Sequence, residues 1–398
     1  MTLWDRDAPV DAAILAFSAG NEHQLDQRLV PYDCAASIAH ARMLGAIGVL
    51  AEEEVARLQA GLEEIRRLHG EGKFPIAPAQ EDCHTAIEEW LTHEVGEAGK
   101  KIHLGRSRND QVLTAVRLYE KDALAELGRR LARLAAALAA RIARDGAIPM
   151  PGYTHMQRAM PTTAGTWLGA FAAAVRDDEE LLRAVAALVD RSPLGTGAGF
   201  GIPVFALDRA LTARELGFAG VLENPIYAQM SRGKLEGSVL HLLSTVMLTL
   251  NRLASDLLLF STAEFGFVSL PEAFCTGSSI MPQKRNPDVL ELVRARYHVV
   301  AAAEGEVRGL AGNLSSGYQR DLGLTKEPLF RAFDATLASA DMMARVVDGF
   351  LLHAEACRRA MTRELHATAE AYALVKEGVP FRDAYRRVAA RYRRDAGE

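Results

Sequence analysis

Apolar residues recur every three or four positions through residues 238–265, and polar residues fill many of the positions between them. The apolar series runs through Val239, Leu242, Val246, Leu250, Leu253, Leu257 and Phe260. This spacing puts the apolar side chains on one face of an α-helix, and Gly237 and Gly266 mark its ends. At about 1.5 Å of rise per residue, the predicted helix is roughly 40 Å long.

A second stretch, residues 112–145, carries the same periodicity in a stripe rich in leucine, with only Gly128 to weaken it. Further long helices are predicted after Pro161, Pro287 and Pro328, because the first turn of a helix tolerates proline. Five long helices with wide apolar faces predict a helix bundle.

Strand signals are scarce, since no hairpin turn stands between two runs of alternating polarity. The predicted fold class is therefore all-α, with a long central helix bundle and smaller helical domains at both ends. Breaks in the pattern predict an N-terminal domain over 1–104, a central bundle over 105–352 and a short C-terminal domain over 353–398. The alanine-rich run 134–140 predicts close helix packing, and we expect an oligomer whose subunits share the bundle.

Composition limits the kind of protein that carries these helices. The chain has 398 residues, 49% hydrophobic and 24% charged, as expected of a globular protein. Its net charge of -5 gives no bulk attraction to nucleic acid or to an anionic membrane, so neither is an expected partner. The longest uncharged stretch, 237–251, has 15 residues. A membrane span needs roughly 20 apolar residues, so this stretch predicts a buried helix. The opening MTLWDRDAPVDAA has no apolar secretory segment, and we expect a cytoplasmic protein.

No metal or nucleotide motif stands out in the sequence. The cysteines are Cys34, Cys83, Cys275 and Cys357. They show neither CxxC nor zinc-type spacing, which predicts reduced thiols, and the histidines form no HExxH pattern. The glycine-rich run 192–201 lacks the GxGxxG register and a preceding strand, so a loop between helices is the better interpretation. We therefore expect neither a metal nor a cofactor.

The segment GSSIMPQKRNPD, residues 277–288, combines serines, adjacent cations and a helix start. Asn286 suits an N-cap and Pro287 the first helical position, so a helix is predicted to begin there. Its free N–H groups, with Lys284, could hold a carboxylate or a phosphate. A capped helix preceded by a polar surface loop is the alternative interpretation.

Three other polar connectors lie at the ends of predicted helices. They are HLGRSRNDQ (103–111) with Arg106 and Arg108, GYTHMQRAMP (152–161) with Thr154 and His155, and SGYQRDLGLTKE (316–327) with Tyr318, Arg320 and Lys326. Each alone could be an ordinary surface segment. Together they supply hydroxyl, imidazole and fixed positive charges, which suits proton abstraction next to a carboxylate. The chemistry indicated is elimination.

Four motifs together resemble the argininosuccinate lyase family, which belongs to the fumarase/aspartase superfamily and includes the δ-crystallins. They are EDCHTAIEEWL (81–91), HLGRSRNDQV (103–112), GYTHMQRAMPTT (152–163) and GSSIMPQKRNPDVLELVR (277–294). The likeness runs from about Phe17 to the ending VKEGVPFRDAY. It implies a fumarase/aspartase-like helical fold, no cofactor, and a homotetramer in which each active site is formed by segments of three subunits.

The resemblance implies reversible elimination of argininosuccinate to arginine and fumarate, a step of arginine biosynthesis. Ser278 would take the proton from the succinyl carbon, while Lys284 and Asn286 would hold the dianionic intermediate. Neighbouring cations and the helix N-terminus would stabilise the serine alkoxide. His155, oriented by Glu291, would be the second proton-transfer group.

The same resemblance assigns further residues to substrate binding. Those expected to hold the substrate carboxylates are Ser107, Arg108, Asn109 and Thr154. Those expected at the other end of the substrate are Tyr318 and Lys326.

The chain departs from the family pattern at two places. Gly323 stands where the family has a glutamine, and the N-terminal FNxS serine is missing, with Gly20 or Glu22 near its position. These departures bear on substrate affinity and identity. Two alternatives therefore stay open: a lyase acting on another N-substituted aspartate, and a non-catalytic relative of the crystallin kind.

Overall fold

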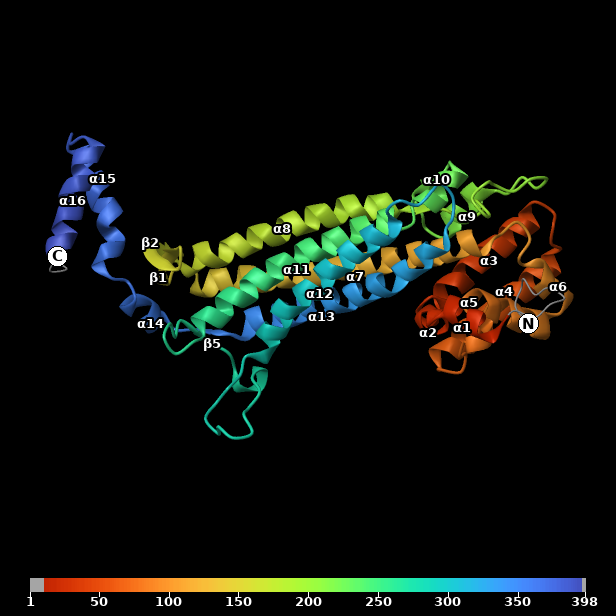
Figure 1. Cartoon of the computed structure of the whole chain (residues 1–398), viewed down its shortest axis with the longest axis horizontal. Helices are drawn as coiled ribbons and strands as arrows, with labels where there is room; N and C mark the ends of the chain where they lie inside the picture. Colours follow the sequence, from red (N-terminus) through yellow and green to blue (C-terminus); the bar gives the residue numbers. More distant parts are fainter. Residues whose placement is uncertain (1–10, 396–398) are drawn as a thin grey trace. The chain divides into compact units, whose positions relative to one another are not determined.

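The computed structural model describes residues 11–395, so the first ten residues, on which the cytoplasmic prediction partly rests, lie outside it. The described chain, whose helices are drawn in Figure 1, divides into two compact units. Unit 1 comprises residues 11–126, 181–244 and 300–334, and unit 2 comprises 127–180, 245–299 and 335–395. The boundaries proposed above for three domains stay a prediction.

Helices dominate both units, which confirms the all-α prediction. The α-helices are α1 (Ala12–Ala19), α2 (Glu22–Leu25), α3 (Val30–Ala46), α4 (Glu52–Gly70), α5 (Cys83–Val95), α6 (Glu97–Lys101), α7 (Arg108–Asp145), α8 (Ala164–Val189), α9 (Arg209–Glu215), α10 (Pro225–Met230), α11 (Lys234–Phe260), α12 (Asp288–Ala311), α13 (Lys326–Gly349), α14 (Ala354–Arg359), α15 (Ala367–Lys376) and α16 (Phe381–Asp395). Short 3₁₀ turns are η1 (Asp26–Arg28), η2 (Pro78–Gln80), η3 (Glu272–Phe274), η4 (Arg320–Thr325) and η5 (Arg363–His366).

Two-stranded sheets join some of these helices. The strands are β1 (Pro149–Thr154), β2 (Gln157–Thr163), β3 (Arg191–Ser192), β4 (Gly220–Val221), β5 (Val268–Ser269) and β6 (Leu351–Leu352). Strands β1 and β2 pair antiparallel, β3 and β4 parallel, and β5 and β6 antiparallel.

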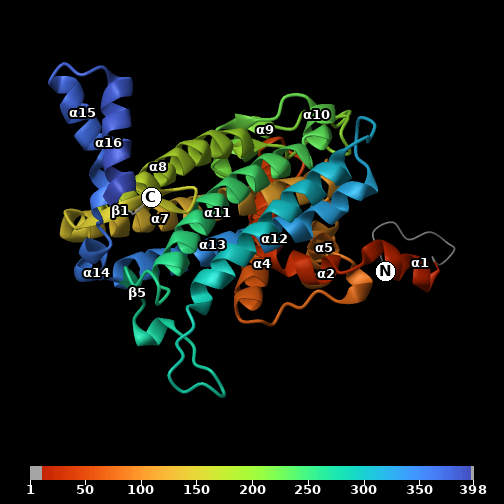
Figure 2. The ribbon, with the colours of Figure 1, turned by 60° about the vertical axis from the view of Figure 1, so that its left-hand side comes forward.

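In unit 2, segments of α7, α8, α11, α12 and α13 lie side by side (Figures 1 and 2). The leucine stripe of α7 is buried here, since Leu131, Leu134 and Leu138 are fully enclosed. One helical turn further on, buried Arg141 donates to the carbonyls of Val347, Asp348 and Phe350. The guanidinium thus satisfies carbonyl groups at the end of α13 that have no partner inside the helix.

In unit 1, helices α3, α4 and α5 pack through their apolar faces. Leu44 of α3, Leu58 and Leu62 of α4, and Leu91 of α5 are fully buried. Asp82 begins α5 by accepting a hydrogen bond from the backbone N–H of Thr85 at 2.9 Å, as an N-cap does. The cap also fixes Asp82 at the edge of the pocket described below.

The β1–β2 hairpin was not expected from the sequence, and the prediction of no hairpin is wrong. Its turn is formed by His155 and Met156, which have φ of 54° and 60°. Two consecutive left-handed residues make a tight hairpin turn, but Asn and Gly are the residues that usually signal it. Pro161 lies opposite Pro151 in the strands rather than in a first helical turn, and α8 begins at Ala164.

The other predicted long helices are confirmed. Helix α7 extends the predicted 112–145 back to Arg108, and α12 begins directly after Pro287. Pro328 lies in the first turn of α13. The stretch Pro225–Phe260 is long and apolar enough to cross a membrane by composition, with half of its most apolar window buried. The α11 part of this stretch is a core helix of the bundle, because side chains such as Val239 and Leu243 are fully buried.

Candidate active site

The serine-bearing loop projects from unit 2 between η3 and α12 (Figure 2). Its base is closed by a short antiparallel bridge in which the backbones of Thr276 and Asn286 exchange hydrogen bonds of 3.0 and 2.8 Å. The Asn286 amide donates to the Gly277 carbonyl at 3.1 Å, and the Thr276 hydroxyl donates to Asp288. Asn286 therefore clamps the loop, whereas the sequence had assigned its side chain to an N-cap.

Within the loop, the Ser278 hydroxyl oxygen accepts hydrogen bonds from the backbone N–H groups of Ile280 (3.4 Å) and Met281 (3.2 Å). These donors would favour a negatively charged oxygen at this position. Lys284 is exposed on the same loop, and Glu291 is exposed in the first turn of α12. The ammonium-bearing Lys284 is thus exposed, while Ser278 is half-buried within the loop.

The predicted imidazole stands on the β1–β2 hairpin. His155 and Thr154 are exposed at its tip. His155 also lines a cavity of about 320 Å³ with Trp167 and Asp256, whose side chains are joined by a hydrogen bond of 2.9 Å. Within unit 2 the hairpin and the serine loop lie at separate places (Figures 1 and 2), so one copy of unit 2 does not bring the hairpin that carries His155 to the loop that carries Ser278.

Four of the remaining predicted residues, Arg108, Asn109, Tyr318 and Lys326, meet in unit 1, whereas Ser107 does not line their cavity. A cavity of about 140 Å³ is lined by Glu22, Asp82, Arg108, Asn109, Val112, Arg232, Tyr318, Arg320, Gly323 and Lys326. These residues come from α2, the N-cap of α5, the start of α7, the turn before α11, the segment before η4, η4 itself and the start of α13. Four cationic and two acidic side chains around so small a cavity suit a ligand that carries both kinds of charge.

Arg108 points its guanidinium at two acids. It donates to Glu81 at 3.0 Å and to Asp82 at a shorter distance. Arg106, which the sequence had paired with Arg108, is buried instead and donates to the Ser37 hydroxyl at 2.7 Å. Arg106 is therefore part of the core, and Arg108 is the arginine of this motif that lines the cavity.

Lys326 is buried and forms an ion pair of 2.5 Å with Asp26 and a longer contact of 3.5 Å with Glu22. Burial opposes its charge, but the two carboxylates raise the pKa of Lys326 above its ordinary value. The lysine is thus a fixed cation at the cavity wall.

Tyr318 lies under the Arg232 guanidinium, whose carbon is 4.9 Å from the ring centre. Sequence reasoning missed Arg232. It precedes Gly233, whose φ of 74° turns the chain into α11. In the sequence, the available signal was an arginine followed by a glycine directly before a predicted long helix.

A cluster of Asp26, Cys83 and His84 has the side chains of a metal site, with ligand atoms within 4.8 Å of one another. Its groups are engaged elsewhere, however. Burial opposes a charge on His84, but Asp33 at 3.1 Å raises the His84 pKa. Burial also raises the pKa of the Cys83 thiol well above its ordinary value, and Asp26 pairs with Lys326. Metal ligands must lose their protons, and both raised pKa values oppose that loss.

Buried Asp110 holds the glycine-rich loop and the Ser107 segment together. One carboxylate oxygen accepts from the backbone N–H groups of Gly195 and Gly197, both at 2.9 Å, and the other accepts from Ser107 N–H at 2.8 Å. Both glycines have positive φ, a conformation that lets neighbouring N–H groups converge on one oxygen. The loop at 192–201 thus wraps a carboxylate of the chain itself.

Replacing Asp110 with asparagine is expected to lower the melting temperature, because one amide atom would be a donor facing backbone donors. A buried group left unsatisfied costs about 1–3 kcal/mol. Differential scanning calorimetry would measure the change, with Asp348→Asn, at an exposed position, as the matched control. Equal melting temperatures for the two variants would contradict this role.

A predominantly helical bundle, a cation-lined pocket in unit 1 and a loop of unit 2 that carries a serine and a lysine fit the class of lyases. A sequence model of the family described as Lyase matches residues 6–301. An argininosuccinate lyase of Thermotoga neapolitana is 47% identical over 99% of this chain and 98% of its own length. One of Sorangium cellulosum is 50% identical over 98% of this chain and 90% of its own length.

A solved structure agrees with these sequence relatives. An EDDS lyase variant with bound fumarate has a TM-score of 0.82 and 26% identity, covering 98% of this chain and 78% of its own. The chain therefore belongs to the argininosuccinate lyase family of the fumarase/aspartase superfamily.

Proposed function

We propose that this protein catalyses the reversible elimination of argininosuccinate to arginine and fumarate, as a carbon–nitrogen lyase. The observation that carries the proposal is its identity of 47% and 50%, over nearly the whole chain, to two argininosuccinate lyases. The mixed-charge pocket of unit 1 supports it, because the substrate joins carboxylates, an ammonium group and a guanidinium in one molecule.

The chemistry assigned to the serine loop is proton abstraction. Ser278, as an alkoxide, takes a proton from the succinyl carbon next to a carboxylate, and the electron pair moves into that carboxylate to form a dianion. Lys284 and Asn286 hold the dianion, which is where preorganised positive charge lowers the barrier. Collapse of the dianion forms the carbon–carbon double bond of fumarate and breaks the carbon–nitrogen bond.

The leaving nitrogen needs a proton, and we assign this transfer to His155, directly or through water, with Glu291 to orient the imidazole. Ser107, Arg108, Asn109 and Thr154 are proposed to bind substrate carboxylates. Tyr318 and Lys326 are proposed to contact the arginine end.

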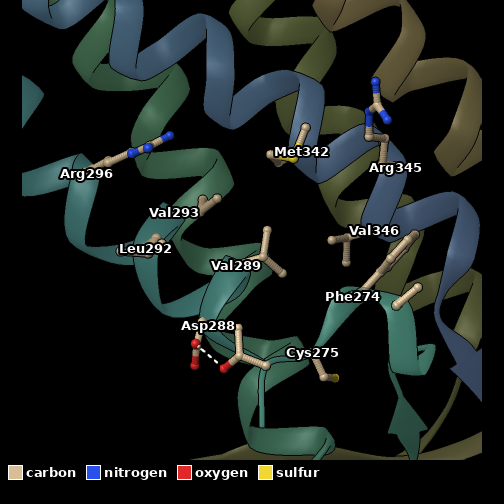
Figure 3. A pocket seen from close by; sticks show the side chains of 12 residues that line it. Phe274, Cys275, Asp288, Val289, Leu292, Val293, Arg296, Met342, Arg345 and Val346 are labelled. Atoms are coloured by element: carbon tan, nitrogen blue, oxygen red, sulfur yellow. Dashed lines mark hydrogen bonds between the residues drawn. The ribbon is translucent and has the colours of Figure 1, made fainter. Parts of the chain in front are cut away.

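We infer that a homotetramer assembles these groups, each pocket of unit 1 being completed by the serine loop and the hairpin of other subunits. Exposed apolar side chains on the long helices of unit 2 support this, among them Leu248, Leu292 and Val299. A groove of about 500 Å³ beside α12 and α13 is also largely apolar, with Phe274 and Val346 facing its interior (Figure 3). Apolar patches of this kind mark protein contacts.

The proposed function is tested by the release of fumarate from argininosuccinate, followed by ultraviolet absorbance with purified protein. Steady formation of fumarate and arginine in equal amounts is the expected result. Absence of fumarate release under conditions where the protein is folded would refute the proposal.

A lyase acting on another N-substituted aspartate is the second candidate. The specific observation behind it is Gly323, where the resembling family has a glutamine that would line the pocket. Assaying N-substituted aspartates side by side with argininosuccinate separates the two, since the true substrate has the highest kcat/KM.

A further inference from the structure

The two places where the chain departs from its family pattern meet in the pocket of unit 1. Gly323 lies in η4 and is buried, and a Cβ atom built on it would lie 3.0 Å from Oε1 of Glu22. A Cβ atom at this position would make an unusually short contact, so the Glu22 carboxylate would have to shift. The missing side chain at Gly323 therefore leaves the space that the Glu22 carboxylate occupies.

Glu22 is held more loosely than Asp82, the other acid that lines the pocket. Its carboxylate lies 3.4 Å from Arg320 and 3.5 Å from Lys326, and it accepts no hydrogen bond from the residues that the structure describes. Both cations have nearer partners, because Lys326 pairs with Asp26 at 2.5 Å and Arg320 donates to the Ser18 carbonyl. The Glu22 side chain is only 14% exposed.

A largely enclosed carboxylate without a hydrogen bond needs a donor to offset its desolvation. Asp82, the other acid lining the cavity, is already occupied by Arg108 and by the N-cap of α5. Glu22 is thus the acid that remains available to a ligand. The neighbouring cations of Lys326 and Arg320 offer a carboxylate site beside it.

Resting on the proposed function, we propose that Glu22 is a specificity residue that binds the ammonium of an α-amino acid head group, the arginine end of the substrate. Ammonium and carboxylate sit on one carbon of such a head group. The ammonium would bind the Glu22 carboxylate while the head-group carboxylate binds the neighbouring cation of Lys326. Gly323 is the positioning residue that admits the Glu22 carboxylate.

The test uses the reverse reaction, in which arginine and fumarate are separate substrates. Glu22→Gln keeps the shape of the side chain and removes its charge. A hydrogen bond to a charged group contributes about 1.5–3 kcal/mol, so KM for arginine should rise about 10- to 100-fold. KM for fumarate should stay near the wild-type value, since fumarate lacks an ammonium group.

An arginine analogue without the α-ammonium, 5-guanidinopentanoate, supplies a second readout. Wild type should prefer arginine to this analogue, and Glu22→Gln should lose most of that preference. Gly323→Ala should raise KM for arginine in the same direction but less, because the added methyl pushes the carboxylate aside. Glu327→Gln is the matched control, since Glu327 follows Lys326 in sequence but pairs with Arg331 outside the cavity.

An unchanged KM for arginine in folded Glu22→Gln would overturn the inference, as would equal rises for arginine and fumarate. If wild type forms no fumarate from argininosuccinate, the proposed function fails separately. Calorimetric binding of arginine and the analogue to wild type and Glu22→Gln then decides the role of Glu22. Equal affinities of wild type for the two compounds would refute it.

Discussion

Replacing Ser278 with alanine is expected to lower kcat for fumarate release about 10²- to 10⁴-fold, as removal of a positioned proton-transfer group does. A methyl group cannot accept the succinyl proton. It also leaves the N–H groups of Ile280 and Met281 without the oxygen they now contact. KM should change little, because Ser278 is assigned to the chemistry and not to substrate binding. Initial rates at saturating argininosuccinate would measure the effect.

The neighbouring Ser279→Ala variant is the control for this substitution. Ser279 is exposed on the same loop and has no assigned role in proton transfer. The kcat of the Ser279→Ala variant should therefore stay close to that of wild type. Melting temperatures of both variants would verify that the fold is retained. A Ser278→Ala enzyme as active as Ser279→Ala would mean that another group removes the proton.

The long helices could be predicted from the sequence because their signal is local and repeated. The stripe through Leu131, Leu134 and Leu138 repeats with helical spacing, and those side chains are buried. The start of α12 could be predicted equally well, because Pro287 restricts its own backbone directly before the helix. Such features depend on a few neighbouring residues, which a sequence displays in order.

The β1–β2 hairpin could not be predicted in the same way. Its turn residues, His155 and Met156, adopt positive φ without the Asn or Gly that would signal it. Pro151 and Pro161 pair across the strands, although proline usually weakens a strand assignment. The hydrogen bonds between the two strands outweigh these local preferences. Single-residue propensities contain no information about such pairing.

The pocket of unit 1 was predicted in part. Arg108, Asn109, Tyr318 and Lys326 were singled out, and the structure brings them to one cavity. The partners that set their charges were not foreseen, because the pairing of Lys326 with Asp26 joins residues 300 positions apart. Ion pairs across such distances depend on the folded chain and leave no periodic trace in the sequence.

Mixing two inactive variants, Ser278→Ala and His155→Asn, is expected to restore activity. The serine loop and the hairpin lie at separate places on unit 2, so we infer that a working site takes them from different subunits. In randomly mixed oligomers, about a quarter of the sites would then combine wild-type Ser278 with wild-type His155. Co-expression of the variants with two different tags, and purification through both tags, would provide the mixed assemblies.

The control pairs Ser278→Ala with Lys284→Met. Both residues lie on one loop of one subunit, between Thr276 and Asn286, so mixing cannot return an intact loop to any site that needs both. This mixture should stay as inactive as its components, while the first recovers activity. Failure of the first mixture in assemblies shown to contain both chains would contradict the inference, because it would mean that one subunit supplies both the loop and the hairpin to a site. Equal recovery in both mixtures would mean that Ser278 and Lys284 serve different sites, which the proposed dianion-binding role of the loop does not allow.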